Sequence, residues 1–313
     1  MNAAPAPRPT GLAAWRDAIL RDRKASVGAA LVALFALMAL VGPLLAGDPD
    51  ALVGLPLQPP SAAHWLGTTG QGQDVLAQTV VGARVTLLVA AAVGLATVAL
   101  GAALGVTAGY LGGAADGALS LLINVFLVLP GLPLAIVIAA YLPSGPATVA
   151  AVLIATGWAW NARVVRAQTL ALRERDFVLA ARVSGESPLR IVTVEILPNM
   201  TSLLVAQVIG STVYAVGAQV GLEFLGLGDV SRVSWGTNLY WATNDSALLT
   251  GAWWTFAPTG VCVALVGFGL VMLNSGFDEL TDPRLQQERR WREHLAARGL
   301  RPGRSTPVAV DRG

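Results

Sequence analysis

Long apolar runs alternate with polar segments along this chain, and the pattern predicts a protein that crosses a membrane six times. A helix needs about 20 apolar residues to cross the hydrocarbon layer of a bilayer. The first run follows basic residues, as in a signal peptide, but a signal's apolar core spans only about 7–15 residues. We therefore interpret it as a membrane span and expect an all-α, polytopic membrane protein. The runs lie at roughly 25–46, 85–109, 119–141, 147–161, 201–220 and 252–273.

The composition agrees with this class. Charged residues make up 13% of the 313 residues, against about 25% in soluble domains. Cys262 is the only cysteine, so the chain cannot form an intramolecular disulfide, and we interpret it as a small packing residue. His64 and His294 lie in different segments. The sequence therefore predicts no metal site and no Cys–His catalytic pair.

Positive charge is concentrated in three places. Nineteen of the 21 Lys and Arg residues lie in the first 24 residues, in segment 163–199 or after residue 274. Arg84 and Arg232 are the other two. Because cytoplasmic loops of membrane proteins carry an excess of Lys and Arg, we expect these three places to face the cytoplasm. Six spans put both termini on that same side.

This orientation divides the chain into a cytoplasmic segment 1–24, a membrane domain 25–285 and a cytoplasmic tail 286–313 without fixed structure. The loops at 47–83 and 223–251 are then expected on the outer side. Trp and Tyr side chains of the second loop fit either an aromatic belt at the outer interface or packing within the loop.

The third span contains Pro130 and Pro133, which must kink or break its helix because each removes an N–H and clashes one turn back. A broken helix at membrane depth needs protein or water around it. The break therefore fits either a place against a translocation pathway or a structural kink. The candidate pathway residues are Asn124, Pro130, Pro133 and Gln207. In the second span, Gly101 and Gly105 form a GxxxG pair that permits close helix contact, although glycine is also common in membrane helices.

Segment 163–199 is predicted to form two short helices joined by a turn. Asp176 can act as the N-cap of the first, and Gly185 can end it in a left-handed conformation. The Ser-Pro pair at 187–188 starts the second helix, with Ser at the N-cap and Pro at the first helical position. Pro198 disfavours helical backbone at the residue before it.

The predicted spans lack the groups that active chemistry requires. They hold almost no ionisable residues, whereas ion-driven carriers need acids or His at membrane depth. The chain has no GxxxxGK[ST] loop for nucleotide phosphates and no Ser/His or paired-Asp constellation in a span. We therefore expect no catalytic residues and no enzyme activity. Energy for transport must come from a partner, and segment 163–199 is the expected place of contact.

The same segment resembles the coupling motif of ABC importer permeases. That motif reads Glu-Ala-Ala, three residues, Gly, nine residues, Ile-x-Leu-Pro. Here the chain reads Leu179-Ala-Ala-Arg-Val-Ser-Gly185, nine residues, then Glu195-Ile-Leu197-Pro198. The spacing fits, while Leu179 replaces the Glu and Glu195 replaces the Ile.

Other ordered motifs between about 64 and 285 resemble the "C" type permeases of the dipeptide, oligopeptide and nickel branch. Thr69, Gln73 and Asn124 depart from that pattern, which usually has Asp, Arg and Asp there. The matching stretches are 64–76, 82–87, 109–116, 223–228, 234–236 and 278–284.

The resemblance implies a type I ABC importer permease fold in a bacterial or archaeal cytoplasmic membrane. It implies one of two permease subunits of a heterodimer, two cytoplasmic ATPase domains that bind the ATP, and an extracytoplasmic solute-binding protein. It implies no cofactor in this chain, no nucleic acid, and di- or oligopeptides as solutes. The alternatives are a nickel chelate or another small solute, or a stand-alone carrier or channel. The implied ATPase-coupling residues are Asp176, Phe177, Ala180, Ala181, Gly185, Leu197 and Pro198.

Overall fold

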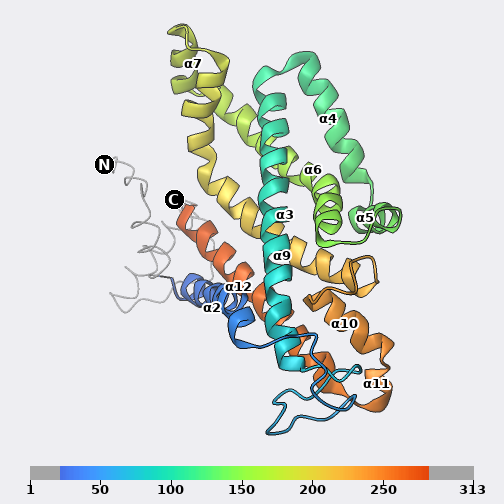
Figure 1. Ribbon diagram of the computed structural model, residues 1–313. Helices are drawn as coiled ribbons and strands as arrows, with labels where there is room; N and C mark the ends of the chain where they lie inside the picture. Colours follow the sequence, from blue (N-terminus) through green and yellow to red (C-terminus); the bar gives the residue numbers. More distant parts are fainter. Residues whose placement is uncertain (1–21, 282–313) are drawn as a thin grey trace, which may run out of the picture.

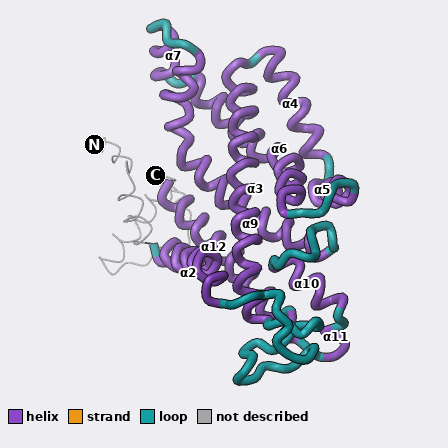
Figure 2. Tube along the Cα trace, viewed as in Figure 1, coloured by secondary structure: helices purple, strands orange, loops and turns teal. Residues whose placement is uncertain are grey.

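A computed structural model describes residues 22–281 of the chain, and these residues form helices and loops without a named strand (Figures 1 and 2). The expectations for most of segment 1–24 and for the tail 286–313 lie outside this range. The main helices are α2 (Arg23–Leu45), α3 (Val75–Leu111), α4 (Gly113–Val128), α5 (Gly131–Ala140), α6 (Pro146–Arg173), α7 (Asp176–Val183), α8 (Pro188–Arg190), α9 (Thr201–Phe224), α10 (Trp235–Asn244), α11 (Ala247–Thr250) and α12 (Ala257–Thr281).

The predicted spans are confirmed as apolar helices. Five helical stretches are long and apolar enough to cross a membrane, and the pair α4 and α5 makes a sixth when it is counted as one span. This pair bends by 85° at its break. The break falls at Leu129 and Pro130, where both residues have extended backbone. The predicted disruption of the third span at the prolines is therefore confirmed.

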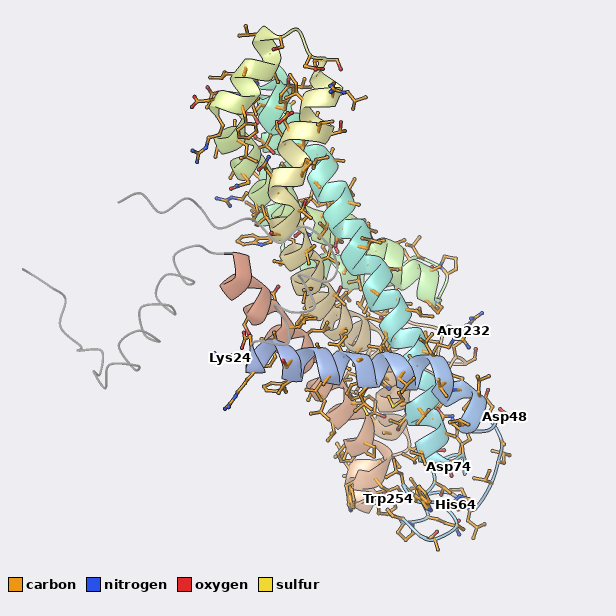
Figure 3. The ribbon with its side chains drawn as sticks, turned by 90° about the vertical axis from the view of Figure 1, so that its left-hand side faces the viewer. Lys24, Asp48, His64, Asp74, Arg232 and Trp254 are labelled. Carbon is orange, nitrogen blue, oxygen red and sulfur yellow. The ribbon has the colours of Figure 1, made fainter. Side chains whose placement is uncertain are left out.

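Helix α3 begins about ten residues earlier than predicted, so the polar loop before it ends at residue 74 rather than 83. Asp74 is the N-cap, and its Oδ1 accepts hydrogen bonds from the backbone N–H groups of Leu76 and Ala77 at 2.7 and 3.2 Å. The cap satisfies first-turn donors and lets the helix start in a polar stretch. His64 Nδ1 lies 3.2 Å from the second carboxylate oxygen of Asp74 and ties the loop to this helix start (Figure 3).

Helix α6 continues past the predicted span end at Asn161 to Arg173. The first part of segment 163–199 is therefore a continuation of a span helix, and only α7 and the stretch from Pro188 match the two predicted short helices. Helices α3 and α6 both extend to the end of the molecule where α7 lies. Figure 1 shows that α7 is at the opposite end of α3 from α10 and α11.

The expectation that Leu197, before Pro198, avoids helical backbone is wrong. Leu197 has helical backbone, with φ −57° and ψ −43°, and the helical path runs from Pro188 to Phe224 as one span. A π-helix, η1 (Ile191–Ile196), precedes the proline, and a 3₁₀-helix, η2 (Leu197–Met200), contains it. The changed hydrogen-bond spacing accommodates the missing N–H and the ring, which a regular α-helix does not tolerate in its interior.

Close helix contacts in the bundle depend on small residues of α3. A Cβ on Gly101 would lie 2.9 Å from the backbone nitrogen of Ala162 on α6, and one on Gly105 would lie 2.5 Å from the Ala162 carbonyl oxygen. A Cβ on Gly94 would lie 2.2 Å from the Thr212 hydroxyl on α9. The GxxxG interpretation is confirmed, because a side chain at either of its glycines would push α3 and α6 apart.

At the end opposite α7, the packing is organised by Trp235, which is fully buried. Its indole N–H donates to the Thr79 carbonyl at 2.9 Å, and its backbone N–H donates to the Thr86 hydroxyl at 3.0 Å. Ser234 caps α10 and donates to the buried Glu223 carboxylate at 2.5 Å. The burial of Trp235 therefore supports internal packing rather than a place in an aromatic belt at the outer interface.

Candidate functional site

Helix α7 is bounded by local hydrogen bonds that the sequence largely predicts. Gly185 has a φ of +79°. Its N–H donates to Arg182 O, and the Glu186 N–H donates to Ala181 O, at 3.0 and 3.1 Å. These two bonds form a Schellman motif, which confirms the predicted C-terminal glycine. Ser187 accepts from the Arg190 N–H and is the predicted N-cap of α8.

The predicted N-cap of α7 is wrong. Arg175 occupies the cap position without a side-chain hydrogen bond, and Asp176 is the first helical residue. The turn after Arg173 is tight, because the Arg175 N–H bonds to the Leu172 carbonyl at 3.0 Å. This shifts the helix start by one residue. The Asp176 carboxylate still favours the helix through its position at the positive end of the helix dipole.

One face of α7 is anchored in an apolar cluster, here called the α7 cluster. Val178 is fully buried in it, and Ala181 packs against it half-buried. Leu197 packs against the same cluster, whereas Pro198 is exposed. The buried members come from five elements and hold α7 on the bundle: Val106, Val165, Val178, Ile191, Ile196 and Met200.

The Arg182 guanidinium adds a second anchor, because it lies over the Tyr110 ring of α3 at 5.2 Å from the ring centre. Such a contact contributes about 0.5–1 kcal/mol at an exposed site. It joins α7 directly to the C-terminal end of α3. Movement of α7 is therefore mechanically connected to α3, as well as to the helical run that continues into α9.

The opposite face of α7 is exposed and apolar. Phe177, Leu179 and Ala180 are exposed, and Val183 is 90% exposed. Leu189, just after the turn, is also exposed. We call these five residues the outward face. Of the predicted coupling residues, Phe177 and Ala180 lie on this face, while Ala181 and Leu197 face the protein interior. An exposed apolar group of this kind is typical of a protein contact surface.

A cleft of about 570 Å³ opens in the helix bundle, between α3, the α4–α5 break, α6, α9 and α12. Its volume is in the range of small-molecule sites. No lining residue is charged. They are Val93, Thr97, Phe126, Leu127, Leu129, Gly131, Thr156, Gly157, Ala159, Trp160, Asn161, Ala206, Gln207, Gly210, Ser211, Tyr214 and Asn274.

Helix α9 supplies the main polar stripe of the cleft. Gln207, Ser211 and Tyr214 line it at spacings of four and three residues, so they share one helix face. Across the cleft, Asn161 on α6 donates to the Ser211 hydroxyl at 3.0 Å. Gln207 differs, because both atoms of its side-chain amide are buried without a hydrogen-bond partner among residues 22–281.

The predicted pathway residues separate into two groups. Gln207 lines the cleft, as do Leu129 and Gly131 beside the proline break. Asn124, Pro130 and Pro133 are exposed and are not part of its lining. Sequence reasoning missed Asn161, Ser211 and Tyr214. The helical spacing of the three polar residues on α9 was the signal that could have identified that face.

Two departures from the resembled pattern contact each other. The Thr69 hydroxyl accepts the backbone N–H of Gln73 at 3.1 Å, and the Gln73 side-chain oxygen accepts from the Gln78 amide at 3.0 Å. A neutral threonine and glutamine therefore stabilise the turn before α3, where the pattern has an acid and an arginine. The two departures belong to one local arrangement.

Comparison with known proteins agrees with this architecture. Residues 101–287 match the family described as "Binding-protein-dependent transport system inner membrane component". The chain is 32% identical to the dipeptide transport system permease protein DppC of Bacillus subtilis (strain 168), over 88% of this chain and 86% of that protein. It is 32% identical to the oligopeptide transport system permease protein OppC of the same organism, over 88% of this chain and 92% of that protein.

A third relative is the oligopeptide transport system permease protein OppC of Mycobacterium bovis (strain ATCC BAA-935 / AF2122/97). It shares 33% identity over 87% of this chain and 94% of its own length. The similarity therefore covers nearly the full length of each protein and includes both α7 and the cleft. The family match covers more than half of the chain, and the chain belongs to the binding-protein-dependent transport system inner membrane components.

Proposed function

We propose that this chain is the membrane-spanning permease subunit of an ATP-driven importer of di- and oligopeptides. The observation that carries the proposal is the near full-length similarity to dipeptide and oligopeptide permeases, together with the exposed apolar outward face at one end of the spans. The uncharged cleft gives the solute a place in the bundle. A second permease subunit, two ATPase domains and an extracytoplasmic binding protein complete the transporter.

The proposed ATPase contact is the outward face of α7. Val183 and Leu179 supply apolar surface for a groove on the ATPase, and Ala180 permits close backbone approach. The other face of α7 is held by Val178 and by Arg182 on Tyr110. ATPase closure would therefore move α7 together with α3 and α9, rather than bend α7 alone.

The proposed orientation places the α7 end in the cytoplasm. The six arginines of segment 163–199 lie on α6, α7, α8 and the turn between α6 and α7, and membrane proteins keep such clusters inside. Both termini then face the cytoplasm. A Ser184→Cys variant in a Cys262→Ser background tests this, since an impermeant maleimide should label it in inside-out vesicles and not in intact cells. Labelling of intact cells would show that the α7 end faces the outside, opposite to the proposed orientation.

The importer itself is tested by expressing the chain with its partner subunits and measuring uptake of a labelled tripeptide into vesicles. Uptake should require ATP and the binding protein. Uptake by this chain without an ATPase would instead identify a stand-alone carrier.

The docking surface is tested by Val183→Asp, with Gln168→Asp at an exposed position of α6 as the matched control. Because a buried unpaired carboxylate is costly at an apolar contact, the first variant should lose ATPase co-purification and peptide-stimulated ATP hydrolysis. The control should retain both. If the two variants behaved equally, α7 would not be the site of the ATPase contact.

A further inference from the structure

Two amide side chains of the cleft, Gln207 and Asn274, have buried atoms without a hydrogen-bond partner among residues 22–281. Asn161 and Ser211 bond to each other, and the Thr97 and Thr156 hydroxyls bond to carbonyls of their own helices. Among residues 22–281, the Gln207 amide nitrogen and oxygen are both buried and unpartnered. Buried polar groups nearly always have partners in a working protein. Gln207 therefore has a donor and an acceptor without partners beside the cleft, and its side chain must rotate to present them to a solute.

A carboxamide of this kind matches one residue of an extended peptide. In an extended chain, the N–H and C=O of one residue point to the same side, as in the paired residues of an antiparallel ladder. The Gln207 oxygen can accept that N–H while its nitrogen donates to that C=O. Asn274 Oδ1, on α12 at the same cleft, is a further buried acceptor without a partner among the described residues.

The rest of the cleft favours recognition of the peptide backbone over charged groups. Its lining has hydroxyls, amides and aromatic rings but no charge, and burial of an unpaired charge is unfavourable. Gly210 lies one turn after Gln207, and a Cβ there would meet nothing within 4 Å. This open space next to the amide leaves room for side chains of different sizes. We propose that Gln207 is a specificity-determining residue that binds the backbone N–H and C=O of the transported peptide.

This inference rests on the proposed function, and the experiment separates the two. The complete transporter is reconstituted with its binding protein, and uptake of trialanine is compared with that of a depsipeptide analogue whose central N–H is replaced by an ester oxygen. Variants are Gln207→Leu and the control Gln168→Leu, the same change at an exposed position of α6. Dividing each variant's peptide-to-depsipeptide ratio by that of the unmodified protein cancels discrimination by the binding protein.

The unmodified protein and the control should prefer trialanine, with about five- to tenfold of the preference due to the Gln207 hydrogen bond. Gln207→Leu should lose that part of the ratio while it still co-purifies with the second permease subunit. An unchanged ratio in Gln207→Leu would overturn this inference alone. Loss of co-purification with the second permease subunit would overturn it too, and would assign Gln207 to the subunit interface. Absence of ATP-dependent peptide uptake by the unmodified protein would overturn both proposals.

Discussion

The Arg166 guanidinium on α6 holds the Asp116 carboxylate on α4 through two hydrogen bonds, one from each of two nitrogens to a separate oxygen. The bond from Nη2 to Oδ2 is 2.7 Å long. The Ser120 hydroxyl donates to the same carboxylate at 3.1 Å. This pair joins α4 to the helix that leads into α7, so it stabilises the end of the bundle that we assign to the ATPase.

Asp116→Ala should lower the free energy of unfolding by about 1–2 kcal/mol, because a two-pronged pair to a charged group is stronger than an ordinary surface pair. Thermal melting in detergent measures the loss. The control is a double-mutant cycle with Arg166→Ala, in which the second change should cost little once Asp116 is absent. Additive losses would show that the two residues act independently.

Gly236→Ala should destabilise the end of the bundle around Trp235. The added Cβ would lie 2.4 Å from Glu223 Cβ and 3.0 Å from the Val220 carbonyl oxygen, and such overpacking costs about 1–3 kcal/mol. Gly217→Ala on α9 is the matched control, because a Cβ there meets nothing within 4 Å. Thermal melting should show a lower melting temperature for the first variant only; equal melting temperatures would contradict the close approach of α9 and α10.

Gly210→Leu should block peptide uptake without unfolding the protein. The position lines the cleft and has open space around its Cβ, so the leucine fills the cleft rather than straining the helix. Replacing glycine within a helix gains up to about 1 kcal/mol in propensity. Gly117→Leu on α4 is the control, because it also has open space but lies outside the cleft. Full uptake by Gly210→Leu would exclude this cleft from the pathway.

The pH dependence of stability should include a contribution from Asp245, which lies between α10 and α11. Burial raises the pKa of its carboxyl, although the Gly70 N–H opposes the shift. The folded protein therefore holds this proton more tightly than the unfolded chain. The resulting stabilisation is present at low pH and is lost as the pH rises above about 4, the ordinary aspartate pKa.

Asp245→Asn should remove this loss, because asparagine stays neutral throughout. Melting temperatures measured from pH 4 to pH 8 should therefore converge at low pH and favour the variant at high pH. The Asp229→Asn variant is the contrasting control. The Ser231 hydroxyl donates a hydrogen bond to the Asp229 carboxylate, which stabilises its ionised form and lowers its pKa. A difference that is constant over this range would contradict the assigned burial of Asp245.

Local chemistry was readable from the sequence where the interacting groups are close along the chain. Gly185 ends α7, and Ser187 caps α8, through contacts of a few residues. Span length and charge distribution depend on composition and are equally local. The coupling motif was recognised by the residue types at Ala180, Ala181, Gly185, Leu197 and Pro198 and by the spacing between them. The Asp176 cap was wrong by one residue because the tight turn after Arg173 is not encoded by a strong turn residue.

Other features depended on contacts between distant segments. Asn161 and Ser211 are 50 residues apart and meet only because α3, α6 and α9 pack closely at glycines. The helix continues through Pro198 because a π-helix precedes it. Trp235 is held in the core by its hydrogen bonds to Thr79 and Thr86.

The sequence by itself therefore determined the membrane class, the helical spans and the family resemblance, and it predicted the coupling segment. These follow from hydrophobic run length, capping and motif spacing. Only the tertiary structure decided which side of α7 faces outward and which polar groups line the cleft. A helix carries residues on every side, and the packing of its neighbours determines which of them remain accessible.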